Sequence, residues 1–222
     1  MTIHYHGTPI TPRSTLLTLA GRHFCVSFAQ DQDLKIVHEI GQSVMLDNGA
    51  FTAWTQGIEI DWYQYYAWVE PWLNFRTTWA VIPDMVDGSE KENDYLVDAW
   101  PFGNRGSPVW HLHEPLERLF RLCTKFNRVC LGSSGEYTTV GNNKWHQRMI
   151  EVFNTTGNSV WFHGLRMMDM GGSAYPFASL DSANVARNHN KNNRTARQMV
   201  AEIDTRQCPG VWHGDVEQGV LL

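Results

Sequence analysis

The sequence has no apolar run approaching the roughly 18 residues that a membrane-spanning helix needs. Its first ten residues, Met1 to Ile10, show no basic segment followed by an apolar one, which is the pattern of a secretory leader. We therefore expect a protein that is neither secreted nor inserted in a membrane. A cytoplasmic location is the simplest expectation.

Cysteine is scarce, and no two cysteines form a CxxC pair. The four residues are Cys25, Cys123, Cys130 and Cys208. Their spacing argues against a structural zinc site and against a dense disulfide framework, and it fits a reducing compartment.

Glycine-rich phosphate-binding motifs are also missing, because neither GxGxxG nor GxxxxGK[ST] occurs. Charged residues make up only 18% of the chain, and 18 basic against 23 acidic side chains give a net charge of −5. This balance argues against a protein that coats nucleic acid, although a local basic patch remains open. With 42% apolar residues in 222, the chain can bury one core, and we place a single domain at residues 1–222.

Short β-rich runs alternate with amphipathic stretches along the whole chain. The candidate strands are Ile3–His6, His23–Phe28, Ser43–Leu46, Thr78–Ile82, Pro108–Leu112, Arg128–Leu131, Val160–His163 and Pro176–Leu180. Apolar residues recur at helical spacing over 62–73, 116–123 and 196–203, with Pro115 at the first helical position of the second stretch. Eight strands with helical intervals predict an α/β fold, a compact (β/α)8 TIM-type barrel, over a doubly wound open sheet. The interval from Gly164 to Tyr175 fits a loop, so we expect the barrel to be irregular around its seventh βα unit.

Polar residues stand at the ends of several predicted strands. The βα loops of a barrel meet at the carboxyl ends of its strands, where the chemistry of such enzymes takes place. Three aspartates and two histidines occupy such positions: Asp47, Asp84, Asp181, His111 and His163. Each alone is explained better by a turn or a helix cap. Together they predict a site.

Two kinds of chemistry are compatible with this set. Converging carboxylates can divide the roles of nucleophile and acid/base when their surroundings separate their pKa values. Alternatively His111, His113 and His163 with an aspartate match the ligands of a metallohydrolase. The Glu114-Pro115 pair that follows His113 turns the chain toward a helix, so we assign no metal ligand.

Four segments, in order, resemble the tRNA-guanine transglycosylase superfamily. Residues 47–51 (DNGAF) are similar to its Asp-Ser-Gly-(Gly/Ala/Ser)-Phe motif, and residues 81–84 (VIPD) to the strand that ends in a base-recognising aspartate. Residues 129–133 (VCLGS) are similar to its Gly-Leu-Gly-Gly loop. Residues 175–182 (YPFASLDS) resemble the late strand that delivers the nucleophile, in the form found in phage and bacterial relatives that insert 7-deazaguanines into DNA. For a phage-encoded chain the expected location is the host cytoplasm.

The resemblance implies a base exchange through a covalent glycosyl-enzyme, with Asp181 as nucleophile and Asp47 as general acid/base. Substrate-binding roles would fall to Asn48, Gly49, Phe51, Asp84, His111, Gly132, Ser133 and His163. The partners would be DNA with a flipped-out or single-stranded guanine and a free 7-deazaguanine base such as 7-cyano-7-deazaguanine. No cofactor is implied, and the sequence assigns no oligomeric state.

The chain departs from the family's tRNA enzymes in three respects. Cys208 and His213 stand alone near the C-terminus, so we expect no zinc subdomain. His111 stands where those enzymes have a glutamine, and Asn48 replaces a serine. The missing subdomain favours a DNA or small-molecule substrate over tRNA.

A basic segment follows Asp181 and contains no acidic residue as far as Arg197. Its asparagines are Asn184, Asn188, Asn190, Asn192 and Asn193. A solvated lead-in to a helix explains this composition equally well as a phosphate contact does. The phosphate interpretation assigns Arg187, Lys191 and Arg194 to the backbone of a bound strand. An N-glycosidase or nucleoside-processing hydrolase on the same barrel, and a metal-dependent barrel hydrolase, remain the alternative functions.

Overall fold

All strands of the computed structural model, which describes residues 1–191 and 193–214, belong to one parallel sheet. They are β1 (Ile3–Gly7), β2 (His23–Ser27), β3 (Ser43–Asp47), β4 (Thr78–Val81), β5 (Gly106–Ser107), β6 (Val109–His111), β7 (Arg128–Gly132), β8 (Trp161–Gly164) and β9 (Ser179–Ser182). The predicted domain runs to Leu222, and its residues 192 and 215–222 lie outside the described residues. No helix in the described part is both long enough and apolar enough to cross a membrane.

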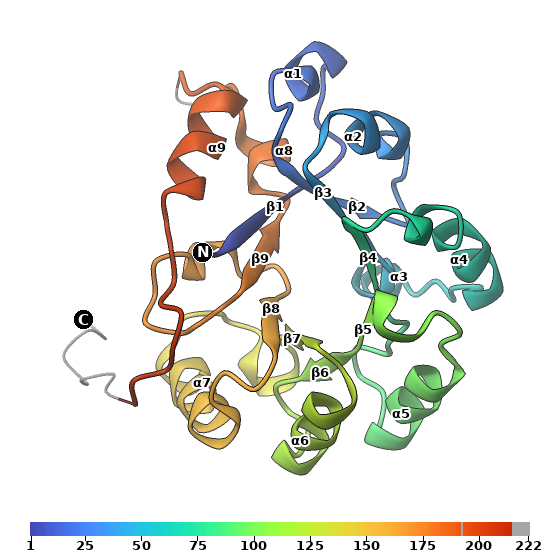
Figure 1. Cartoon of the computed structure of the whole chain (residues 1–222), viewed down its shortest axis with the longest axis vertical. Coiled ribbons are helices and arrows are strands. Elements are labelled where there is room, and N and C mark those ends of the chain that lie inside the picture. The colour runs from blue at the N-terminus through green and yellow to red at the C-terminus, as the bar shows by residue number, and fades with distance from the viewer. Residues whose placement is uncertain (192, 215–222) are drawn as a thin grey trace.

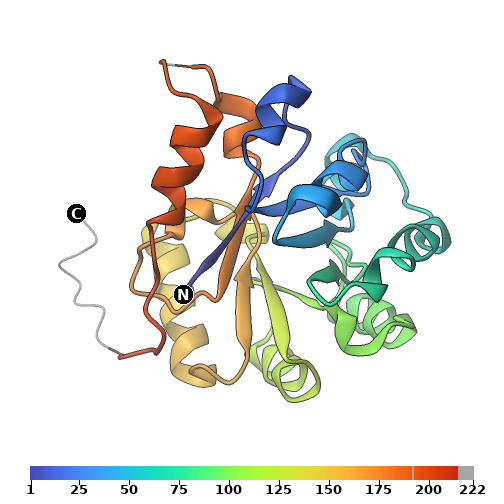
Figure 2. The same cartoon turned by 45° about the horizontal axis from the view of Figure 1, so that its top comes forward.

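The sheet is bent into a nearly closed barrel. Its order is β5-β4-β3-β2-β1-β9-β8-β7-β6, so its two outer strands, β5 and β6, are consecutive in the chain. Only Pro108 separates them, and proline cannot donate to a strand ladder. Both views show the strands in the middle with the helices around them, and β1 between β2 and β9 (Figures 1 and 2).

Helices fill most of the intervals between strands. The α-helices are α1 (Arg13–Leu17), α2 (Leu34–Ile40), α3 (Ala50–Gln56), α4 (Trp62–Val69), α5 (Glu90–Ala99), α6 (Leu116–Lys125), α7 (Asn143–Thr156), α8 (Asn184–Asn188) and α9 (Ala196–Asp204). Short 3-10 turns are η1 (Trp72–Asn74), η2 (Gly103–Arg105), η3 (Gly135–Tyr137) and η4 (Met168–Met170). The interval after β8 holds only η4, which confirms the predicted loop.

Side chains alternate between the barrel interior and the helices, as the period of a strand requires. In β2, Phe24 and Val26 join the large core between strands and helices, whereas Cys25 faces inward. The interior cluster is Tyr5, Cys25, Met45, Trp79, Val81, Val109 and Cys130. The same alternation places Asp47, the last residue of β3, and Asp181, the third residue of β9, on the inward side.

Side-chain caps start several helices. Asp61 accepts from the backbone amides of Tyr63 and Gln64 at the start of α4, and Thr195 and Gln198 form a capping box on α9. The prediction for Pro115 is wrong by one position. Its ψ of 143° makes it the N-cap of α6, because the chain is still extended there.

The last predicted strand is wrong in its bounds. The prediction spans Pro176–Leu180, whereas β9 covers Ser179–Ser182. Pro176 has no N–H for a ladder bond, and pairing with the neighbouring strands begins where Ala178 donates to Phe162 and accepts from Ile3. Asp181 therefore lies within a strand rather than in the loop after it.

Candidate active site

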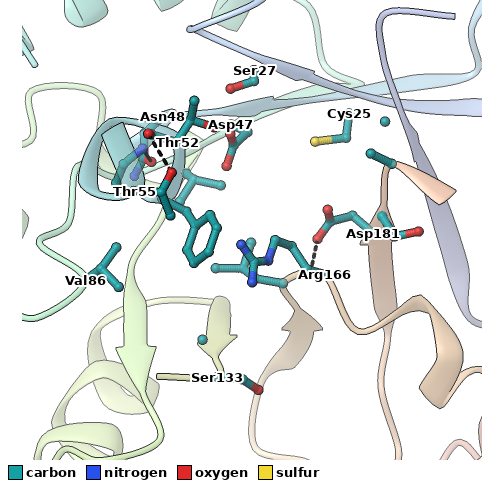
Figure 3. Close-up of a pocket in the computed structure, with 18 of the residues that line it drawn as sticks. Cys25, Ser27, Asp47, Asn48, Thr52, Thr55, Val86, Ser133, Arg166 and Asp181 are labelled. Atoms are coloured by element: carbon teal, nitrogen blue, oxygen red, sulfur yellow. Dashed lines mark hydrogen bonds between the residues drawn. The ribbon is translucent and has the colours of Figure 1, made fainter. Parts of the chain in front are cut away.

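A cavity of about 950 Å³ opens at the carboxyl ends of the strands. The residues on its wall include Asp47 from β3, His111 from β6, Gly132 from β7 and Asp181 from β9. Because all strands are parallel, these chain segments reach the same end of the barrel. Figure 3 shows Asp47 and Asp181 on two sides of the cavity with Cys25 near them. The structure thus brings both predicted catalytic carboxylates to one cavity.

Asp47 is the last residue of β3, and Gly49 turns the chain back over it. Gly49 has a φ of 77°, a left-handed conformation that favours glycine, and its amide donates to Asp47 Oδ2 at 3.2 Å. Burial first, and then the negative charge of Asp181, raise the pKa of Asp47 from 3.8 to about 6, against the lowering effect of the Gly49 amide. Asp47 can therefore hold a proton close to neutral pH.

Asp181 is held by two groups from the β8 side of the cavity. Its Oδ1 accepts the backbone amide of Arg166 at 2.8 Å and lies 3.2 Å from His163 Nε2. His163 Nδ1 contacts the Ser179 hydroxyl at 2.8 Å. Burial lowers the pKa of His163, so the ring is neutral, and a carboxylate can only accept. The tautomer that satisfies both contacts donates from Nε2 to Asp181 and accepts from Ser179 at Nδ1.

His163 itself lies beneath the cavity. Its side chain is 0% exposed, and its ring meets the edges of Tyr5 and Trp79 at centroid distances of 6.0 and 5.2 Å. It is not one of the residues on the cavity wall. His163 reaches a molecule in the cavity only through Asp181.

A second polar cluster joins the ends of β3, β4 and β6. Asn48, 2% exposed, donates its amide to the Ile82 carbonyl at 2.8 Å and to Asp84 Oδ1 at 2.7 Å. The other carboxylate oxygen, Asp84 Oδ2, lies 2.9 Å from His111 Nε2. Asp84 and His111 both line the cavity. Asn48 positions Asp84, because its amide protons are used within the protein.

The ring of His111 leaves one nitrogen without a partner. Within the described residues, Nδ1 of this buried side chain makes no hydrogen bond. It faces Gly132, where an added Cβ would lie 3.0 Å from it. Gly132 and the next residue, Ser133, also line the cavity, and the Ser133 hydroxyl accepts the indole N–H of Trp145 at 2.9 Å. The glycine therefore lets the backbone of β7 pack closely against the ring of His111, where any larger residue would be crowded.

Arg166 is a site residue that no sequence pattern predicts. Its guanidinium carbon lies 3.3 Å from the ring centroid of Phe51, a cation–π contact on the cavity wall. Burial lowers the pKa of Arg166, and the charges of Asp181 and Asp47 act against that effect. Its backbone φ of 55° is unusual for a residue other than glycine. That left-handed turn points the backbone amide of Arg166 at Asp181, and no local sequence pattern predicts it.

The basic segment contributes one cation to the cavity. Arg187 lines it, whereas Lys191 and Arg194 do not. Lys191 donates to Asn188 Oδ1 at 2.9 Å, and Arg194 pairs with Glu202 on α9. Asn192, part of the same predicted segment, lies outside the described residues.

The residues considered as metal ligands are not gathered at one point. His111 and His113 stack with centroids 5.7 Å apart, and His113 contacts Ser134 at 2.8 Å, while His163 lies below Asp181. Among residues 1–191 and 193–214, no group of three or more His, Cys, Asp or Glu side chains is arranged to hold a metal ion.

Comparisons of this chain with protein-family models, with curated proteins and with solved structures found no match.

Proposed function

We propose that this protein is a DNA base transglycosylase that exchanges guanine for a 7-deazaguanine through a covalent aspartyl-glycosyl intermediate. The observation that supports it best is the pair of carboxylates on one cavity in unlike surroundings. Asp47 is protonated up to a pH of about 6, whereas Asp181 is oriented by a backbone amide and a neutral imidazole. Such a division is what acid/base and nucleophilic roles require of two carboxyl groups.

In the first half of the reaction, an oxygen of Asp181 bonds to C1′ of the target nucleotide. The bond from C1′ to N9 breaks, and its electron pair passes into the purine. Asp47 gives its proton to that purine, which leaves as neutral guanine. The base must be out of the duplex stack for this attack, at a cost of a few kcal/mol.

In the second half, the incoming 7-deazaguanine loses its N9 proton to the Asp47 carboxylate. N9 bonds to C1′, the ester bond breaks, and Asp181 recovers its negative charge. Two inversions at C1′ retain the anomer, as in retaining glycosidases. No electron acceptor or donor is needed to balance either half.

Cys25 lies on the same cavity and is a poor competitor for the nucleophilic role. Burial raises the pKa of the Cys25 thiol well above its usual value, and the charges of Asp181 and Asp47 raise it further. A thiol is a nucleophile only as its thiolate. The carboxylate of Asp181 therefore remains the best candidate for the bond to C1′.

Base recognition would fall to the cluster around Asp84. The Watson–Crick edge of guanine presents two donors, N1–H and the 2-amino group, and a carboxylate can accept both. Asn48 and His111 each contact one oxygen of Asp84 and fix its plane toward the cavity. Gly132 and His111 line the cavity together, and Phe51, which is 40% exposed and also lines the cavity, offers an aromatic ring for stacking.

We also infer that β5 and β6 act as one strand interrupted at Pro108. The barrel then has eight βα units, and β8 with η4 forms the irregular seventh. The residues that follow this strand, from Leu112 to Pro115, lead directly into α6.

The experiment is a base-exchange assay with single-stranded and duplex DNA that carries radiolabelled guanine. The protein is incubated with each DNA in the presence and in the absence of 7-cyano-7-deazaguanine. Release of label together with incorporation of the deazapurine supports exchange. Release without incorporation would instead make the protein an N-glycosidase, and no release from either DNA would overturn both.

The variant Asp181→Asn tests the covalent step. It should abolish label release and the protein–DNA adduct seen on a denaturing gel, while Glu59→Gln, a substitution of an exposed carboxylate away from the cavity, should change neither. Normal turnover by Asp181→Asn would rule out the mechanism.

A further inference from the structure

A second cavity of about 320 Å³ lies at the opposite end of the barrel, where the strands begin. Its walls include the first residues of several strands, among them Ile3, His23, Ser43 and Arg128. None of its residues lines the cavity that contains Asp47 and Asp181. The two cavities are thus separate, with the interior cluster of the barrel between them.

The walls of this second cavity are basic. Three arginines and one histidine line it, and none of its described wall residues is acidic: the basic residues are His23, Arg76, Arg105 and Arg128. This contrasts with the net charge of −5 of the whole chain. Elsewhere in the chain, buried or half-buried arginines such as Arg118 and Arg148 are paired with carboxylates.

Arg128 is the central member of this group. Its guanidinium carbon lies 4.1 Å from the ring centroid of Trp79 and 5.8 Å from that of Trp161, so two indoles hold its plane. Its Nε is buried without a hydrogen bond, and among the described residues it has no ion-pair partner. Burial lowers the pKa of Arg128, which expresses the cost of keeping this charge away from water.

The other two arginines complete a set of unpaired donors. Arg105 gives one N–H to the Phe75 carbonyl, and its Nε is also buried without a partner. Arg76 is exposed and makes no ion pair within the described part of the chain. Like charges around one small volume repel one another unless an anion lies between them, and guanidinium groups match the oxygens of a phosphate in spacing and charge.

We propose that this cavity binds the phosphate group of a small phosphorylated molecule, held by Arg76, Arg105 and Arg128 at the amino-terminal mouth of the barrel. Its volume is at the lower end of the range for small-molecule sites and exceeds what a lone phosphate fills. The hydroxyl of Tyr5 and the indole of Trp79 form its floor, joined by a hydrogen bond of 2.9 Å. Inorganic phosphate, pyrophosphate and a nucleoside monophosphate share the required chemistry.

The test is a titration of tryptophan fluorescence in the whole protein, at constant ionic strength set with chloride. Trp79 and Trp161 flank the Arg128 guanidinium, so a bound anion should change their emission in a saturable manner. Saturation by inorganic phosphate and pyrophosphate would identify a free-phosphate site. Tighter saturation by a nucleoside monophosphate, with none by the matching nucleoside, would identify a phosphorylated metabolite, and both results support the proposal.

Matched variants distinguish binding in this cavity from non-specific attraction of an anion to basic side chains. Arg105→Gln should weaken binding roughly tenfold or more, since it removes charge-assisted donors. Arg13→Gln removes the same charge from an exposed arginine of α1 outside the cavity and should leave the affinity unchanged. Arg128→Gln should abolish the response, and if that variant fails to fold, Arg76→Gln and Arg105→Gln decide the matter.

The proposal is overturned by two results. One is the absence of saturation in the wild type with all three phosphate compounds. The other is an equal affinity in the Arg13, Arg76 and Arg105 variants, which would mean non-specific attraction. An Asp181→Asn variant should bind these probes like the wild type, because this cavity does not depend on the proposed base exchange.

Discussion

Replacing Asp47 with asparagine should stabilise the folded protein at neutral pH, although the same change should remove the base exchange. The carboxyl group of Asp47 is half-buried and near the charge of Asp181, and its pKa in the folded protein is raised from 3.8 to about 6. The unfolded chain ionises this group at the lower value. At neutral pH the ionised carboxylate of Asp47 therefore lowers the free energy of unfolding of the wild type.

The sign and size of the effect follow from the two pKa values. Between pH 3.8 and about 6 the folded protein binds more protons at Asp47 than the unfolded chain does, so the free energy of unfolding falls as the pH rises. This contribution is fully present below the ordinary pKa and is lost by about pH 7. The loss amounts to about 1 kcal/mol at pH 4.5 and about 3 kcal/mol at pH 8, at roughly 1.4 kcal/mol for each pKa unit.

Urea unfolding of the wild type and of Asp47→Asn at these two pH values measures the difference. The asparagine variant lacks the ionisable group, so its advantage over the wild type should be larger at pH 8 than at pH 4.5 by about 2 kcal/mol. Glu59→Gln makes the same chemical change on an exposed side chain and should shift neither unfolding curve. A loss of stability in Asp47→Asn that is equal at both pH values would refute the reasoning, because it would reveal a structural role for the carboxylate.

Three further predictions concern residues in and around the cavity that contains Asp47 and Asp181. His163→Gln should lower kcat by about 10²-fold with little change in KM, since it loosens Asp181 without touching substrate; an unchanged kcat would contradict this. Arg187→Gln should weaken DNA binding and reduce the slope of log affinity against log salt by about one, whereas Arg194→Gln, which breaks an existing ion pair, should have much less effect; equal effects would contradict it. Asn48→Ala should raise KM for the free base and cost about 1–3 kcal/mol in urea unfolding, because it leaves a buried carbonyl without its donor; an unchanged KM would argue against its role in base recognition.

The sequence allowed the strands to be located because a parallel barrel buries both faces of each strand, which makes short apolar runs easy to recognise. The sequence also predicted that Asp47, Asp84 and Asp181 lie at one end of the barrel, since every strand of such a barrel points the same way. The depth of a side chain was harder to foresee. Alternation predicts that His163 points inward, but only the neighbouring rings of Tyr5 and Trp79 show that it lies below the cavity.

The missed features depend on contacts between distant segments. Arg166 enters the site through a left-handed turn in a loop whose sequence carries no helical or strand periodicity. The basic segment was interpreted from composition alone, and composition cannot show that Arg194 pairs with Glu202. The basic cavity likewise combines residues from loops and strands that are not adjacent in the chain, so no local motif predicts it.

The pairing of β1 with β9 has a consequence for how the protein is made. Thr2, just before β1, donates to Phe177, just before β9, across 175 positions. During synthesis β1 therefore lacks β9, one of its two neighbouring strands, until almost all of the barrel has been made. Contacts of such long range delay folding, and the strand that comes last is also the one with Asp181. Asp181 therefore takes its place beside Asp47 only when the strands on both sides of β1 have been synthesised.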